Sequence, residues 1–292
     1  MKHNIIYHNQ DLDGYCSGAI IKYYLLNETS ALEEDIRMIG WNYGDADPTQ
    51  IDGKFYITDV SFPENVMISL RSANDEVTWI DHHKSSIEES IGKWDWFLGI
   101  RRVGDSASFL AWEYFFPNTR IPNVVKYVDL YDVWKKDTET PWEDIMQAQW
   151  GMRKYLKDPS DKDDYWVWEL ELQSKNISDY IWNEGVTIYD HIIEENKTHA
   201  KNAFDLQFEG MNCCALNIRG NSEVVASVVR EDHDCILYFR YTKGKWAISL
   251  YANEKNPNKI DLSLIAKDWG GGGHWGASGF EVNDINFILN PQ

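Results

Sequence analysis

The N-terminal part of the chain alternates short apolar runs with longer stretches in which apolar residues recur at helical spacing. A helix is predicted from Gly14 to about Asn27. Another begins at Ser61 and Pro63, a capping serine followed by a first-turn proline. Four apolar runs are predicted as strands: Asn4–His8, Arg37–Trp41, Lys54–Val60 and Glu76–Ile80. Strands that alternate with helices in this way are typical of a mostly parallel sheet with helices on both faces.

The C-terminal part has a different pattern. From about Ser174 to Ala203, apolar residues form a stripe along one face of a long predicted helix. The elements predicted beyond it are three strands, a helix and a final strand, at Asn212–Ile218, Cys235–Tyr241, Lys245–Tyr251, Leu262–Trp269 and Gly279–Val282. We therefore expect an α/β protein with an N-terminal domain at residues 1–173, whose mostly parallel sheet is flanked by helices. A helical connector at 174–204 and a smaller mixed α/β domain at 205–292 would follow.

Acidic and imidazole side chains follow the predicted strands of the N-terminal domain. They occur in four segments, which contain His8, Asp11 and Asp13; Asp59; Asp81, His82 and His83; and Asp129 with Asp132. Taken one by one, these segments are explained as turns, helix caps or surface residues. In an open α/β sheet, however, ligands bind beyond the carboxyl ends of the strands. The shared position of the four segments therefore predicts one site at that edge of the sheet.

The residue types at this predicted site indicate metal binding. Several carboxylates gathered together repel one another unless a cation neutralises them. Oxygen ligands mixed with a few imidazoles favour Mn²⁺ or Mg²⁺ over zinc, which prefers thiolates or a histidine-rich tetrahedron. Because about six candidate ligands are present, we expect two divalent ions rather than one, with Mn²⁺ ranked before Mg²⁺.

Charge and composition limit the classes of partner. The formal net charge of −19 and the isoelectric point near 4.7 exclude a basic track for long nucleic acid. A short anionic substrate is still compatible, because bound cations invert the field inside a single cleft. The cysteines lack metal-binding spacing and indicate no disulfide framework. Without an apolar leader or a membrane-spanning stretch, we expect a cytoplasmic protein, and a homodimer is left open.

Two signatures make the sequence similar to a known family. The first consists of Asp81-His82-His83 after an apolar strand, Asp11-Leu12-Asp13-Gly14 upstream, and Asp59 between them. It resembles the DHH phosphoesterase superfamily, which includes RecJ-like exonucleases, nano-RNases and family II pyrophosphatases. The second is the glycine-rich run Gly270–Phe280 with Gly-Gly-Gly-His inside it, which resembles the signature of the DHH-associated substrate domain. The resemblance covers nearly the whole chain, with both signatures in the expected order.

The resemblance implies a role for each candidate residue. One ion would be held by His8, Asp11 and Asp59, and the other by Asp13, Asp59, His82 and Asp132, so that Asp59 bridges the pair. Asp81 would orient an imidazole or a water. His83 would face the substrate phosphate, as a hydrogen-bond donor or as the acid that protonates the leaving oxygen. The implied substrate-binding groups are Gly271, Gly272, Gly273, His274, Lys84 and Arg102, with Arg101 as a further candidate.

The activity implied by the resemblance is that of a two-metal phosphoesterase, in which a hydroxide bridging the ions attacks the phosphorus. The substrates would be short RNA or DNA oligonucleotides or small nucleotides, as for nano-RNases, which are oligoribonucleases with exonuclease activity. The cleft would lie between the two domains. One alternative is an inorganic pyrophosphatase or polyphosphatase, ranked lower because that branch lacks the Gly-Gly-Gly-His signature. Another is a non-catalytic nucleotide-sensing protein, disfavoured because every expected ligand type is present.

Overall fold

A computed structural model of the protein describes residues 1–48, 52–73, 76–94, 96–136, 138–219 and 228–289. The chain forms two compact units, Met1–Tyr189 and Asp190–Gln292. The division falls inside the long helix α8 (Asp179–Ala200), which lies in the stretch predicted as a helical connector. Among the described residues, no helix combines the length and the apolar character that crossing a bilayer requires.

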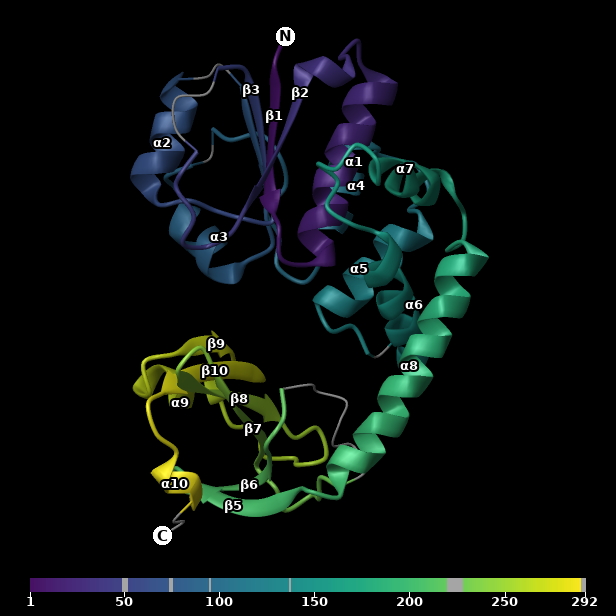
Figure 1. Ribbon diagram of the computed structural model, residues 1–292. Helices are drawn as coiled ribbons and strands as arrows, with labels where there is room; N and C mark the ends of the chain where they lie inside the picture. Colours follow the sequence, from purple (N-terminus) through teal and green to yellow (C-terminus); the bar gives the residue numbers. More distant parts are fainter. Residues whose placement is uncertain (49–51, 74–75, 95, 137, 220–227, 290–292) are drawn as a thin grey trace. The chain divides into compact units, whose positions relative to one another are not determined.

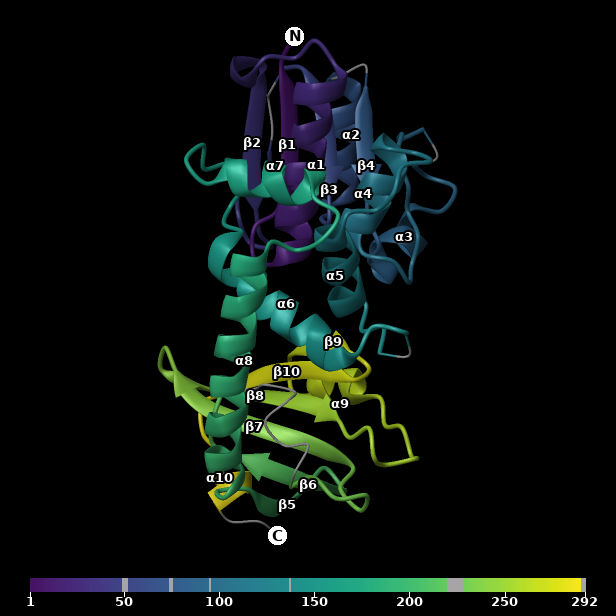
Figure 2. The same ribbon diagram turned by 90° about the vertical axis from the view of Figure 1, so that its right-hand side faces the viewer.

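The first unit is built around a four-stranded parallel sheet. Its strands are β1 (His3–His8), β2 (Ile36–Trp41), β3 (Lys54–Thr58) and β4 (Val77–Ile80). They lie side by side in the order β2-β1-β3-β4, as Figure 2 shows, and each neighbouring pair is parallel. Strands β1, β3 and β4 are buried almost throughout, because both faces of the sheet are covered. The α/β fold class predicted from the sequence is confirmed.

Helices cover the two faces of this sheet. The helices before α8 are α1 (Leu12–Glu28), α2 (Glu64–Ala73), α3 (Lys84–Ser90), α4 (Ala107–Phe115), α5 (Asn123–Asp132), α6 (Trp142–Tyr155) and α7 (Tyr165–Gln173), with a short 3₁₀ turn at Glu33–Asp35. Helices α5, α6 and α7 pack on α1, on α4 or on one another. Figure 1 shows α2 and α3 on one face and α1 and α4 on the other. Consecutive residues of β1 accordingly enter different cores. Ile6 shares a core with Met67 of α2, whereas Ile5 and Tyr7 share a core with Ile21 of α1.

The second unit is a mixed sheet with two short helices. Its strands are β5 (Phe204–Phe208), β6 (Met211–Leu216), β7 (Cys235–Thr242), β8 (Lys245–Ala252), β9 (Gly272–His274) and β10 (Ala277–Val282), and its helices are α9 (Leu262–Asp268) and α10 (Asn286–Leu289). The order is β5-β6-β7-β8-β10-β9; the β6–β7 pair is parallel, and the other neighbouring pairs are antiparallel. Strand β5 was not predicted, although its apolar residues Phe204, Leu206 and Phe208 alternate with polar ones, a pattern typical of a half-buried strand.

The start of α1 is joined tightly to the end of β1. Asp11 caps the helix, since its Oδ1 accepts a hydrogen bond from the backbone N–H of Gly14 at 3.0 Å. A Cβ atom at residue 14 would lie only 2.0 Å from the carbonyl oxygen of His8. Glycine alone permits this approach, which brings the first turn of α1, with Asp11 and Asp13, beside His8.

We predict that Gly14→Ala destabilises the protein by about 2 kcal/mol or more, because the added methyl group overlaps a backbone carbonyl. Inside an unobstructed helix, the same replacement stabilises by about 0.5–1 kcal/mol. Urea unfolding followed by circular dichroism measures the difference. Gly276→Ala is the matched control, since a Cβ there meets only the Ala252 side chain, at 3.6 Å. Unchanged stability in Gly14→Ala would contradict the proposed tight junction.

Candidate metal centre

One edge of the parallel sheet gathers the acidic and imidazole side chains that follow its strands. They are His8 at the end of β1, Asp11 and Asp13 at the start of α1, Asp59 after β3, Asp81, His82 and His83 after β4, and Asp132 at the end of α5. Parallel strands bring their carboxyl ends to a common edge, so segments distant in the sequence meet there. The structure thus brings together all the side chains that the sequence assigned to the metal ions.

These side chains form two groups with ligand-like spacing. The groups are His8, Asp11 and Asp59, and Asp13, His82 and Asp132, and within each group the ligand atoms lie within 4.8 Å of one another. In the first group, His8 Nδ1 is 2.9 Å from Asp11 Oδ2 and 3.5 Å from Asp59 Oδ2. In the second, His82 Nε2 is 3.5 Å from Asp132 Oδ2 and 3.8 Å from Asp13 Oδ2.

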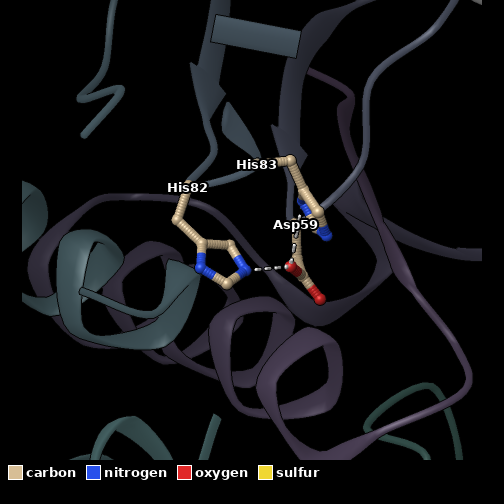
Figure 3. A group of neighbouring side chains, drawn as sticks. All are labelled: Asp59, His82 and His83. Carbon is tan, nitrogen blue, oxygen red and sulfur yellow. Dashed lines mark ion pairs between the residues drawn. The ribbon is translucent and has the colours of Figure 1, made fainter. Parts of the chain in front are cut away.

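Asp59 links the two groups. Its Oδ2 faces His8, whereas its Oδ1 lies 3.3 Å from Nε2 of His82, a contact drawn in Figure 3. The backbone φ of Asp59 is 60°, in the left-handed region that non-glycine residues rarely adopt. Its N–H donates to the carbonyl of Ile80 at 3.0 Å, which ties this turn to β4. The strained conformation presents one buried carboxylate to both groups.

The imidazole of His83 is oriented by Asp81. The fully buried Asp81 accepts hydrogen bonds at Oδ1 from the backbone N–H of His82 at 2.8 Å and of His83 at 3.1 Å. The same oxygen accepts from Nδ1 of His83 at 2.8 Å, so Nε2 is the ring nitrogen left to meet a ligand. His83 also lies beside Asp59, whose carboxylate faces both imidazoles in Figure 3, and His82, His83 and Asp59 form a third group within 4.8 Å.

Backbone amides at the start of α4 hold two of the acidic side chains. The oxygens of Asp13 accept from the N–H groups of Ala107 and Ser108, both at 2.8 Å. Asp129 lies three residues before Asp132 on α5, and its carboxylate accepts from the N–H of Ser106 at 2.8 Å. The sequence patterns did not reveal this supporting segment. The sequence feature that could have revealed it is Ser106, because serine is a preferred N-cap residue and Ser106 is the N-cap of α4.

The charges of the centre shift the ionisation of its members. Burial opposes the charge of His8, but hydrogen bonds to Asp11 and Asp59 outweigh burial and raise the pKa of His8 to about 10. Burial also opposes the charge of His82, and its carboxylate neighbours raise the pKa of His82 to about 10. Burial, followed by the charge of Asp59, raises the pKa of Asp13 above its usual range. These shifts report an excess of negative charge, so the mixed carboxylate and imidazole set fits two divalent cations.

The two arginines proposed for substrate binding have protein partners. Arg102 donates to Asp105 at 2.8 Å and to the two oxygens of Glu113 at 3.0 and 2.9 Å. Arg101 donates to backbone carbonyls in and after β4. Lys84 begins α3 directly after the histidine pair, and its side chain is exposed. Arg101 therefore has a structural role, and substrate binding by Lys84 and Arg102 stays a prediction.

The glycine-rich signature forms the connection from α9 into β9 and β10. A Cβ at Gly271 would lie 2.0 Å from the carbonyl oxygen of Gly279, and Gly273 has a φ of 137°. Packing and backbone conformation therefore require glycine at both positions, whereas Gly272 has open space around it. The side chain of His274 lies outside the described part of the structure. Phosphate binding by these amides and by His274 stays a prediction.

Comparisons with known sequences give a distant relative. No family model matches the sequence. The chain is similar to an uncharacterized protein of Acanthamoeba polyphaga mimivirus, with 23% identity over 302 residues that cover 98% of this chain and 68% of that protein. At this level of identity, the relative carries no assignment of activity.

Solved structures identify the fold. The DHH domain of a member of the S1p family of ribosomal proteins has a TM-score of 0.59 and 14% identity, over 99% of this chain and 85% of that chain. A pGpG-specific phosphodiesterase from Vibrio cholerae has a TM-score of 0.54 and 13% identity, over 98% and 95%. An exopolyphosphatase-related protein from Bacteroides fragilis has a TM-score of 0.53 and 17% identity, over 97% and 88%. The chain therefore has the fold of DHH-domain proteins.

We predict that binding of Mn²⁺ at pH 7 releases at least two protons, one from each ligating imidazole, with a further contribution from Asp13, whose pKa is raised to about 7. The pKa of His8 and of His82 is raised to about 10, so both are protonated at pH 7, whereas a metal ligand must be neutral. The affinity for Mn²⁺ should therefore increase as the pH rises from 7 towards 10. Calorimetric titration in buffers with different ionisation enthalpies measures the number of protons released.

Two variants test the assignment of these protons. His8→Asn should release about one proton fewer than the wild-type protein. His191→Asn should release the same number, because His191 is an exposed histidine on α8. Mn²⁺ binding without proton release would contradict imidazole ligation at this centre.

Proposed function

We propose that the chain is a member of the DHH phosphoesterase superfamily and hydrolyses phosphate esters with two divalent ions. The observation that carries the proposal is the presence of two neighbouring ligand groups, joined by the buried carboxylate of Asp59, which belongs to the first group and lies 3.3 Å from His82 of the second. His8 and Asp11 would complete one ion site, and Asp13, His82 and Asp132 the other. Mn²⁺ is the favoured ion, since the donors are carboxylates and imidazoles without a thiolate.

The similarity of the fold to solved DHH-domain structures supports the proposal of phosphate chemistry. The solved structures that share this fold include a pGpG-specific phosphodiesterase and an exopolyphosphatase-related protein. Both names describe phosphate chemistry in proteins with the same architecture. We therefore propose short oligonucleotides or small nucleotides as substrates, and inorganic polyphosphate or pyrophosphate as the second candidate. The acidic chain, with its net charge of −19, favours short ligands over long polymers.

Each residue of the metal centre has a separate role in the proposed reaction. When bound, a pair of divalent ions lowers the pKa of water and offsets the negative charge of a phosphate group. Asp59 holds the two ion sites in a fixed relation, because its backbone is tied to β4. Asp81 fixes the ring of His83 through Nδ1, so Nε2 can donate a proton to the leaving oxygen. This arrangement requires no covalent nucleophile from the protein.

The test of the proposed function is hydrolysis of a substrate panel with Mn²⁺. The panel contains a linear dinucleotide, inorganic pyrophosphate and a nucleotide 3′,5′-bisphosphate. We predict turnover of the dinucleotide, its loss on chelation with EDTA, and a fall of more than about 100-fold in kcat/KM for Asp59→Asn, since removing only an orienting partner typically costs 10–100-fold. Turnover confined to pyrophosphate would favour the second candidate. Nucleotide binding without any turnover would favour a sensing protein.

His83 is expected to act on the substrate rather than to hold the ions. We predict that His83→Ala lowers kcat for the dinucleotide by about 100-fold or more, the range typical of a lost general acid. The affinity for Mn²⁺ and the melting temperature should stay close to those of the wild-type protein. The same calorimetric titration measures the ion affinity. A large loss of Mn²⁺ affinity in His83→Ala would assign His83 to the ion sites and remove it as the acid.

A further inference from the structure

A cluster of aromatic side chains lies directly after the last candidate ligand of the metal centre. Trp134 is 41% exposed, and its backbone φ is 57°, which is unusual for so bulky a residue. Its ring centroid is 4.8 Å from that of Trp142, and the rings of Tyr131 and Trp142 stack with an interplanar angle of 13°. We call Tyr131, Trp134 and Trp142 the aromatic platform. Its residues come from α5, the following turn and α6, and these two helices pack against each other.

Two cationic side chains lie over the rings of the aromatic platform. The ammonium group of Lys136 lies 4.6 Å from the ring centroid of Trp134 and 4.9 Å from that of Trp142. The guanidinium of Arg153 lies 5.2 Å from the ring centroid of Tyr131. Cations over ring faces add positive charge at an aromatic surface. In a chain with a net charge of −19, these two side chains place positive charge beside the aromatic rings, near a centre that would bind phosphate.

The platform is held close to the metal centre by the chain itself. Trp134 follows Asp132 by two residues, a separation that spans at most about 7 Å. The turn between them is anchored, because Lys135 donates to Asp129 and to Asp105, both at 2.8 Å. Asp132 in turn lies 3.5 Å from His82. Because the Cα atoms of Asp132 and Trp134 lie at most about 7 Å apart, a dinucleotide with its phosphate at the metal centre is long enough to reach the aromatic platform.

We infer that the aromatic platform binds a nucleobase of the substrate, which stacks on the exposed face of Trp134. The inference rests on the proposed function, since the phosphate of the same molecule would occupy the metal centre. Base stacking on aromatic side chains tolerates any sequence, because every nucleobase has a π-face. Lys136 and Arg153 attract the sugar–phosphate backbone of such a ligand. The substrate class is then a short, base-bearing phosphodiester rather than inorganic pyrophosphate or polyphosphate.

The experiment compares two ligands that share a backbone. One is a dinucleotide and the other is its abasic counterpart, and both carry a methylene group in place of the scissile oxygen so that binding is measured without turnover. Titration calorimetry with Mn²⁺ present should show that the wild-type protein binds the dinucleotide about tenfold more tightly than the abasic ligand. In Trp134→Ala, affinity for the dinucleotide should fall about tenfold, and affinity for the abasic ligand should not change.

Two further variants separate stacking from a structural effect. Trp134→Phe should recover most of the lost affinity, because phenylalanine keeps an aromatic face. Trp166→Ala removes another exposed tryptophan, on α7, and should leave both affinities unchanged. Equal loss of affinity for the two ligands in Trp134→Ala, or no loss for either, would overturn the inference.

Turnover distinguishes this inference from the proposed function. If the wild-type protein hydrolyses neither the natural dinucleotide nor its abasic counterpart with Mn²⁺, the proposed function fails. The binding titrations then still decide whether Trp134 recognises a base. If both are hydrolysed with equal kcat/KM and Trp134→Ala changes neither value, the phosphoesterase proposal stands and the aromatic platform has no part in substrate recognition.

Discussion

The compensation of buried charge at one edge of a parallel sheet is the constraint on which the rest of this structure depends. Asp13 and Asp59 are almost fully buried, and a buried carboxylate is costly unless donors or cations surround it. Amides at the start of α4 supply donors to Asp13, and the imidazoles of His8 and His82 surround Asp59. The local backbone follows from this requirement, since the turn after β3 adopts a left-handed conformation and the turn into α1 needs a glycine.

The same constraint explains how an acidic chain can be proposed to bind an anion. Most acidic side chains leave the surface negative, which disfavours long nucleic acid. At the sheet edge, however, the carboxylates face one another and raise the pKa of their imidazole neighbours. Divalent cations at such a place turn a negative cluster into a site for phosphate. Lys136 and Arg153, which lie over the rings of the aromatic platform, are the cations proposed to meet the remainder of such a ligand.

Much of the first unit could be predicted because its signals are local. Apolar runs identified β1 to β4 to within a few residues, and the turn residues after them identified the candidate ligands. Other features depend on contacts that no local pattern encodes. Asp129 and Asp132 lie on one helix, yet the first meets a backbone amide from a distant turn and the second meets His82. Arg101 and Arg102 are adjacent, but one bonds to backbone carbonyls and the other to carboxylates.

The sequence by itself determined the α/β class, the positions of the four strands of the first unit and the types of side chain available at their ends, because periodicity and turn chemistry act over a few residues. Only the tertiary structure decided which oxygen of Asp59 faces His8 and which faces His82, that α4 amides hold Asp13, and that Trp134 is exposed two residues after the candidate ligand Asp132. These features depend on the order of strands in the sheet and on the packing of helices against it. Distances between segments far apart in the chain are fixed by packing, and no local pattern contains them.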